Sequence, residues 1–154
     1  MAEPEATKQT FKGSCHCGKI RYAAALALSK PPVAQRCNCT MCLKQGYTTI
    51  RITADDFTLI SPENKAQVQN YKMKSNSNNN INKYFCGTCG IHCWSEGEFE
   101  FQGVKYPLFT INILTLDQPQ EGLELSDFKI MYSDGRNDNW AAGSRDTPWP
   151  GGCI

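Results

Sequence analysis

The stretch FCGTCG, Phe85 to Gly90, places two cysteines three positions apart and follows each of them with a glycine. A C-x-x-C turn of this kind is typical of zinc knuckles, because the glycines allow a tight turn that directs backbone N–H groups at the sulfurs. Two thiolates on one tetrahedral zinc ion lie about 3.8 Å apart, and cysteines at this spacing can meet that separation. The stretch therefore predicts half of a metal site, whose other half must come from elsewhere in the chain.

Two further cysteine clusters supply candidate partners: a C-x-C pair at Cys15 and Cys17, and a C-x-C-x-x-C triplet at Cys37, Cys39 and Cys42. In a C-x-C pair both side chains leave an extended segment on the same side and can converge on one ion. A structural zinc ion needs four ligands, which the C-x-C pair and the C-x-x-C pair supply together. The triplet then has three ligands and an open fourth position, the pattern of a catalytic zinc.

Spacing alone leaves two alternatives open. Cys37 and Cys39 could close a site with Cys86 and Cys89, which would leave the other cysteines as buried thiols. The nine cysteines could instead form disulfide bonds, but a secreted disulfide scaffold would have an export signal and usually an even number of cysteines. The sequence begins MAEPEATKQT, which lacks the apolar segment of a secretory signal. We therefore expect reduced thiols, zinc ligation and a cytoplasmic location.

The composition excludes several classes of protein. A chain of 154 residues with 40% hydrophobic residues suits one domain with a real core. The formal net charge is +1 and no run of Lys and Arg occurs, so nucleic acid is not an expected partner. The apolar run at residues 23–28 is too short to span a bilayer. A small molecule is the expected ligand.

Short strands separated by turn residues predict a mainly β fold with few short helices. The expected strands lie at residues 18–28, 46–52, 57–60, 68–74, 81–85 and 106–114. Thr53 or Asp55 is placed to cap a short helical turn, and the asparagine-rich segment 75–80 is expected to be a hairpin loop. We expect a disordered lead-in over residues 1–10, a single zinc-binding domain over 11–140, and an irregular C-terminal tail over 141–154.

Several segments, taken in order, resemble one known family: the glutathione-dependent formaldehyde-activating enzymes, which also include the centromere protein V domain. The segments are GSCHCGKIRY, CNCTMCLKQGY, YFCGTCGIHCW, INILTLD and DGRNDNW, and they run from about Gly13 to Trp140. The resemblance implies the zinc-stapled β-tent fold, shared with a small-GTPase exchange-factor-like protein and with methionine sulfoxide reductase B domains. It also implies a structural zinc on Cys15, Cys17, Cys86 and Cys89, and a catalytic zinc on Cys37, Cys39 and Cys42.

The activity named for the family is the condensation of glutathione with formaldehyde to S-hydroxymethylglutathione, formally a carbon–sulfur lyase reaction in reverse. The resemblance therefore implies a zinc-dependent carbon–sulfur lyase that acts on a thiol adduct, with two zinc ions per chain and a small thiol such as glutathione as partner. One alternative is a non-catalytic zinc-binding interaction module of the centromere protein V type. A reductase would need a nucleophilic cysteine outside the zinc sites, and neither Cys93 nor Cys153 lies in a motif for that chemistry.

Five residues are candidates for contacts with the substrate. Glutathione is anionic, so Lys44 and Arg51 near the triplet, and Arg136 in the DGRND segment, are candidate partners for its carboxylates; each could equally be a solvated surface charge. His92 could transfer a proton or could be a structural histidine. Thr48 could line the pocket or could be an ordinary strand residue.

Overall fold

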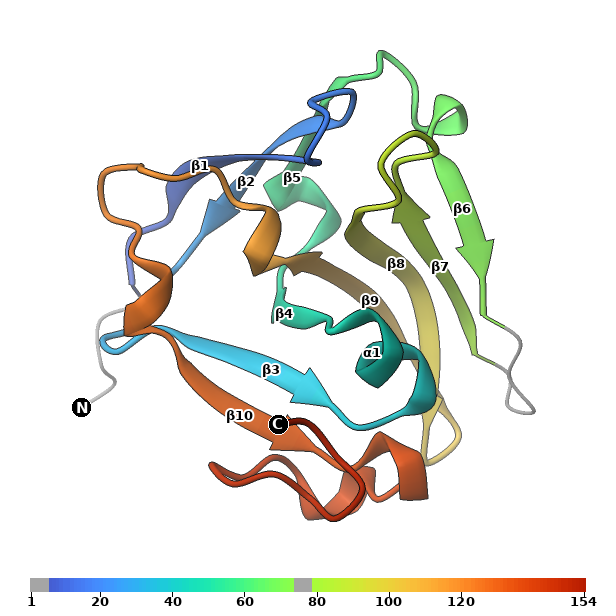
Figure 1. Ribbon diagram of the computed structural model, residues 1–154. Helices are drawn as coiled ribbons and strands as arrows, with labels where there is room; N and C mark the ends of the chain where they lie inside the picture. The colour runs from blue at the N-terminus through green and yellow to red at the C-terminus, as the bar shows by residue number, and fades with distance from the viewer. Residues whose placement is uncertain (1–5, 74–78) are drawn as a thin grey trace.

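The computed structural model describes residues 6–73 and 79–154 and consists mainly of two β-sheets (Figure 1). The smaller sheet has the strand order β1-β2-β5, with β1 at Gln9–Ser14, β2 at Arg21–Leu26 and β5 at Phe57–Ser61. The larger sheet has the order β10-β3-β4-β9-β8-β7-β6. Its strands are β3 (Val33–Cys37), β4 (Thr48–Arg51), β6 (Gln69–Lys72), β7 (Asn80–Phe85), β8 (His92–Phe101), β9 (Val104–Asn112) and β10 (Lys129–Ser133).

The helices in the described part of the chain are short. The α-helix α1 covers Thr40–Gln45, and the 3-10 turns are η1 (Ala54–Asp56), η2 (Lys65–Gln67), η3 (Ile113–Thr115), η4 (Leu125–Asp127), η5 (Gly135–Asn137) and η6 (Trp140–Ala142). Thr53, one of the two residues predicted to cap a helical turn, is the N-cap of η1. No helix in residues 6–73 and 79–154 is long and apolar enough to cross a membrane. The predicted mainly β class, with short strands and few short helices, is confirmed.

Four strands were not predicted: β1, β3, β8 and β10. The sequence of β3, VAQRC, has one buried residue and no alternation of buried and exposed positions, and the strand pairs with a neighbour on each side. The first four residues of β8 are all buried, so the strand lacks the alternation that marks a half-exposed strand. The disordered lead-in predicted for residues 1–10 is wrong at residues 9 and 10, because Gln9 and Thr10 pair with β2. Residues 1–5 of that lead-in lie outside the described residues.

The remaining predicted boundaries concern a loop and the tail. Most of the asparagine-rich segment falls at 74–78, outside the described residues, and Asn80 already belongs to β7. Residues 143–154 contain neither helix nor strand beyond a bridge between Tyr132 and Arg145. Trp149 Nε1 also donates to the Tyr132 carbonyl at 3.0 Å, so this segment lies along β10.

Aromatic side chains join the two sheets into one core. The ring of Phe57, from the small sheet, lies 4.9 Å from that of Trp94 and 5.0 Å from that of Phe109, both from the large sheet. Tyr22, from the neighbouring strand β2 of the small sheet, stacks on Phe57 with ring centroids 5.2 Å apart. Trp94 and Tyr22 are fully buried. The burial of these large apolar surfaces is the main force that holds the sheets together.

A parallel strand pair sets the position of the second cysteine cluster. β10 pairs with β3 in parallel, with Ser133 opposite Cys37. Parallel neighbours end at the same edge of a sheet, so the turn after Cys37 and the turn after Ser133 lie together. The first of these turns leads into α1, and the second is η5.

Candidate metal centres

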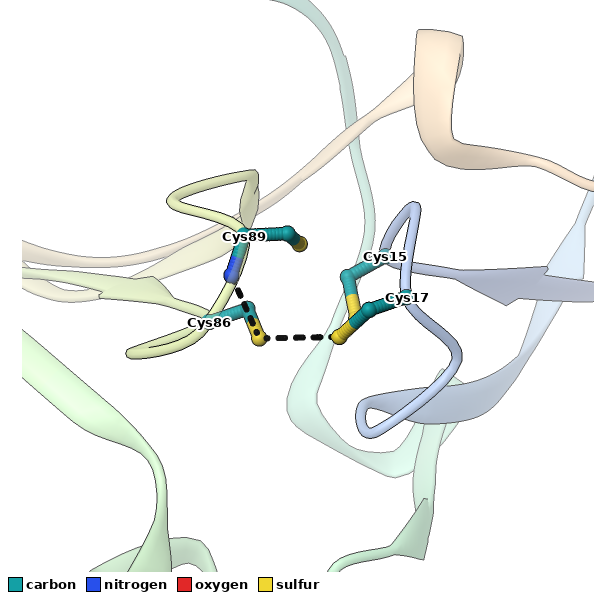
Figure 2. A group of neighbouring side chains, drawn as sticks. All are labelled: Cys15, Cys17, Cys86 and Cys89. Atoms are coloured by element: carbon teal, nitrogen blue, oxygen red, sulfur yellow. Dashed lines mark hydrogen bonds between the residues drawn. The ribbon is translucent and has the colours of Figure 1, made fainter.

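The four sulfurs of Cys15, Cys17, Cys86 and Cys89 converge from two loops that face each other (Figure 2). The loop with the first two cysteines follows β1 of the small sheet, and the other joins β7 to β8 of the large sheet. The Sγ atoms of Cys15 and Cys17 are 3.7 Å apart, and those of Cys17 and Cys86 are 3.5 Å apart. These separations are close to the edge of about 3.8 Å for sulfurs around one tetrahedral zinc.

Each loop is closed by a backbone hydrogen bond from a glycine amide to the carbonyl of the first cysteine, over three residues in one loop and four in the other. The amide of Gly18 donates to the Cys15 carbonyl at 3.1 Å, and the amide of Gly90 donates to the Cys86 carbonyl at 2.8 Å. Each glycine has a positive φ, 79° and 77°, which a glycine adopts without strain. The amide of Cys89 points at the Cys86 sulfur, as the C-x-x-C-G pattern predicts, with a distance of 3.5 Å.

The donor set fits a closed thiolate site. Cys15 and Cys86 are each 3% exposed, and all nine cysteines of the chain are free thiols. Burial raises the pKa of the Cys15 thiol to about 11, and a cation bound by the four sulfurs would offset this burial by stabilising the thiolate. These four cysteines could hold a metal ion that joins the two sheets.

A second cluster, which we call the cysteine triad, consists of Cys37, Cys39 and Cys42. Cys37 ends β3, Cys39 is the N-cap of α1, and Cys42 lies in the first turn of that helix. The amide of Cys39 points at the Cys37 sulfur at 3.3 Å, and the amide of Cys42 points at the Cys39 sulfur at 3.4 Å. All three side chains are half-buried. The triad could hold a metal ion with three sulfurs.

The three thiols of the triad differ in pKa. Hydrogen bonds from Cys37 and then from Cys42 lower the pKa of Cys39. The hydrogen bond to Cys39 raises the pKa of Cys37 to about 11, and hydrogen bonds to Cys37 and Cys39 raise that of Cys42. The shifts favour Cys39 as the first thiol of the triad to lose its proton, and a bound metal would displace the protons of all three.

The DGRND segment supports the triad from the neighbouring turn. Asn38 is 2% exposed and donates from Nδ2 to Asp134 Oδ1 at 2.8 Å. Its Oδ1 accepts the amide of Arg136 at 2.9 Å. The pKa of Asp134 is lowered by this hydrogen bond and by bonds from Asn137 and Asn139. A residue between two cysteines thus fixes the two turns to each other.

The predicted substrate residues do not all gather at the triad. Lys44 is exposed in the last turn of α1. Thr48 is buried and accepts a hydrogen bond from Arg36 Nε at 3.0 Å. Arg51 donates to the Pro107 carbonyl at 2.7 Å. The Arg136 side chain is exposed, and its Nε donates to the Asn38 carbonyl at 3.4 Å, so it contacts the triad loop.

His92 is buried at the start of β8. Its Nε2 lies 2.9 Å from the Trp94 carbonyl and 3.0 Å from Ser95 Oγ, while Nδ1 has no hydrogen-bond partner among the described residues. The ring stacks on Tyr47 with centroids 4.2 Å apart. Burial and then the charge of Lys83 lower the pKa of His92 to about 4, so the ring is neutral at pH 7.

Tyr47 and Lys83 were not predicted as site residues. Tyr47 follows α1, and its amide donates to the Cys42 carbonyl at 3.0 Å. Lys83 Nζ lies 4.9 Å from the centroid of the Tyr47 ring. In the sequence, Lys83 lies in the polar strand INKYF, where a lysine is ordinarily solvent-exposed. Only its position in the folded sheet distinguishes it.

Two surface grooves lie away from the triad. One, of about 510 Å³, is lined by Cys86 and its neighbours together with Lys19 and Gln69. The other, of about 640 Å³, includes Arg51, Lys65 and other residues on the face of the large sheet. Neither groove is lined by a triad cysteine.

Comparison with known proteins gives a family and a fold. The model of the family described as glutathione-dependent formaldehyde-activating enzyme matches residues 10–128. No curated protein matches the chain. The crystal structure of a Rhodobacter sphaeroides protein from a structural genomics programme is similar, with a TM-score of 0.53 and 22% identity over 75% of this chain and 93% of that chain. At this level of identity, the similarity to the Rhodobacter sphaeroides protein shows a common fold alone.

The matched segment contains all seven clustered cysteines and covers most of the chain. The protein belongs to the glutathione-dependent formaldehyde-activating enzyme family. The family is enzymatic, and its name relates it to formaldehyde and glutathione.

Proposed function

We propose that the protein is a zinc-dependent carbon–sulfur lyase that acts on an adduct of a small thiol, of the S-hydroxymethylglutathione type. The observation that carries the proposal is the contrast between a four-sulfur cluster and a three-sulfur cluster in one domain. Four ligands saturate a tetrahedral ion, whereas three leave one position for a substrate. The family match supports the choice of a thiol adduct.

In this proposal Cys15, Cys17, Cys86 and Cys89 hold a structural zinc, and the triad holds a catalytic zinc. A zinc ion bound by the triad would supply Lewis acidity, which favours the thiolate over the thiol. Cleavage of the adduct breaks its S–C bond, and the electron pair moves to sulfur. The hydroxyl group loses its proton as the carbon becomes a carbonyl.

The chain itself positions the three sulfurs. Asn38 and Asp134 lock the triad loop against η5, so the cysteines keep their geometry when a ligand binds. A pKa of about 4 makes His92 a weak base at pH 7. We therefore assign the hydroxyl proton to solvent, and give His92 the role of holding the Tyr47 ring beside the triad. The cytoplasm, which keeps thiols reduced, is the proposed compartment.

Cobalt substitution tests the open position. Co²⁺ replaces zinc in tetrahedral sulfur sites and absorbs visible light, so millimolar glutathione is expected to shift the absorption bands of the cobalt-loaded protein. Cys39→Ser is expected to abolish the shift, because it removes a triad ligand. Unchanged bands on addition of glutathione to the wild-type protein would contradict the proposal.

One contact favours the alternative, a non-catalytic zinc-binding interaction module. The Cys153 thiol lies 3.5 Å from the Cys37 carbonyl, near enough for a small movement of the tail to bring a fourth thiol toward the triad. In a closed site of this kind, glutathione would not shift the cobalt absorption bands, whereas Cys153→Ser would change them. In the proposed enzyme Cys153→Ser leaves both the spectrum and the glutathione shift intact.

A further inference from the structure

We propose that Lys83 forms an anion subsite beside the cysteine triad and that this subsite selects thiol substrates that carry a carboxylate. The inference rests on the proposed function and adds a specificity residue to it. The subsite consists of the Lys83 ammonium, the Tyr47 ring over which it lies, and the open side of the triad.

The first observation is a buried ammonium group without a carboxylate partner. Lys83 is 5% exposed, and lysine is rarely buried unless it is paired. Among residues 6–73 and 79–154, no carboxylate forms an ion pair with Lys83 and no acceptor hydrogen-bonds its Nζ. The Tyr47 ring at 4.9 Å offsets only part of the lost hydration. An ammonium group held in this way is ready for an external anion.

A second lysine of the same sheet provides a contrast. Lys65 Nζ also lies over a tyrosine ring, 5.6 Å from the centroid of Tyr84. Its side chain is 52% exposed, and it forms an ion pair with Glu96. Lys65 therefore has an exposed side chain and a carboxylate partner, whereas Lys83 is buried and has no carboxylate partner in the described structure.

The second observation places Lys83 at the triad. It contacts Tyr47, whose amide is bonded to the Cys42 carbonyl. Lys83 makes no hydrogen bond to a triad sulfur in the described structure, so the N–H donors of its ammonium group are available to a ligand.

Strand register extends the cationic surface. Lys83 is opposite Ser95, Ser95 is opposite Thr110, and Thr110 is opposite Arg51, in a row across β7, β8, β9 and β4. Directly paired residues share one face of a sheet, so the row has a cation at each end and hydroxyls between. The two hydroxyls bind the Tyr47 hydroxyl. No acidic residue belongs to the row.

Binding of small thiols to the cobalt-loaded full chain tests the proposal. The probes are 3-mercaptopropionate, which is anionic, 2-mercaptoethanol, which is neutral, and cysteamine, which is cationic. Because the three thiols differ in acidity, the quantity compared is the ratio of Kd between variant and wild type for each thiol, read from visible absorption. Lys83→Met is expected to weaken the binding of 3-mercaptopropionate about 10-fold or more and to change the Kd of 2-mercaptoethanol by less than about 3-fold. The same variant is expected to bind cysteamine more tightly than the wild type.

Lys83→Arg is expected to keep the preference for the anionic thiol, because it keeps the charge. Lys65→Met is the matched control and is expected to change none of the three ratios. Lys83→Gln replaces Lys83→Met if the latter fails to fold, as judged by thermal melting. The same weakening of all three thiols in Lys83→Met would mean that Lys83 only balances the charge of the metal–thiolate cluster, and would overturn the proposal while the proposed function stands. If no thiol perturbs the cobalt bands of the wild-type protein, the proposed function fails and this inference fails with it.

Discussion

At the scale of single residues, Asn38 lies between two triad cysteines and uses both ends of its amide. Its Nδ2 binds Asp134, and its Oδ1 accepts the amide of Arg136. A buried amide of this kind is costly to lose, because its partners remain buried and lose their hydrogen bonds. The role of the residue between the cysteines is therefore to hold the ligands in place.

Asn38→Ala is expected to lower the free energy of unfolding by roughly 2 kcal/mol, because it removes the two hydrogen bonds that a buried amide makes to Asp134 and Arg136. Urea denaturation of the metal-loaded protein measures the change. Asn137→Ala is the control, because Asn137 also binds Asp134 but is exposed, and it is expected to cost under about 1 kcal/mol. Equal losses in the two variants would contradict the proposed role of burial.

His92 gives a pH prediction. Its folded-state pKa of about 4 lies below the ordinary value of 6.5, so between these pH values the unfolded chain binds a proton that the folded chain does not. The stabilisation is complete above pH 6.5 and decreases as the pH falls toward 4, by up to about 3 kcal/mol. An NMR titration of the ring measures the pKa, and His16→Gln assigns the resonances because the chain has two histidines. A value near 6.5 would show that the ring is solvated.

At the scale of elements, the parallel pair β3–β10 decides what surrounds the triad. The pairing places η5 against the end of β3, close enough that a Cβ at Gly135 would lie 2.5 Å from the Cys37 sulfur. It would also lie 2.7 Å from the Trp140 ring. The glycine in the DGRND segment is thus required by the close approach of a backbone turn to a candidate ligand.

Gly135→Ala is expected to displace the Cys37 sulfur and to weaken metal binding at the triad by about 10-fold or more, with little change at the four-cysteine cluster. Competition with a chromophoric chelator measures the affinity of the more weakly held ion. Gly103→Ala is the control: Gly103 has a φ of 78° in open space at the β8–β9 turn, so its substitution strains the backbone far from the triad. If both variants affect the metal alike, the contact with Cys37 is not the cause.

At the scale of the whole molecule, the four-cysteine cluster joins two sheets, whereas the triad lies at the end of one sheet. Cys15 and Cys17 come from the loop after β1, and Cys86 and Cys89 from the loop after β7, so a metal ion there links distant parts of the chain. The triad cysteines lie within one short segment. The two clusters should therefore differ in their effect on folding.

The wild-type protein is expected to contain about two zinc ions per chain by elemental analysis. Cys86→Ser is expected to lower the melting temperature sharply or to prevent soluble expression, because metal binding at a closed cluster is part of the folding free energy. Cys39→Ser is expected to remove one ion with a much smaller change in melting temperature. Similar melting of the two variants would refute the division into a structural and a catalytic site.

The sequence by itself determined the local geometry of the metal centres and much of the strand pattern. C-x-C and C-x-x-C spacings bring sulfurs together within one turn, and the glycines after the cysteines allow that turn, so these features depend only on near neighbours. The same holds for the apolar strand at 106–114, most of which is observed in β9. Local chemistry was enough to identify the seven candidate ligands.

The tertiary structure alone decided what surrounds those ligands. Asn38 and Lys83 are polar residues that would ordinarily be solvent-exposed, yet both are buried. Asn38 is hydrogen-bonded to Asp134 and Arg136, and Lys83 lies over the Tyr47 ring, so the partners of both come from distant parts of the chain. Arg51 and Lys83 share one row only because β4 and β7 are joined through β9 and β8. Burial and strand register depend on contacts between residues far apart in sequence, and no local pattern encodes them.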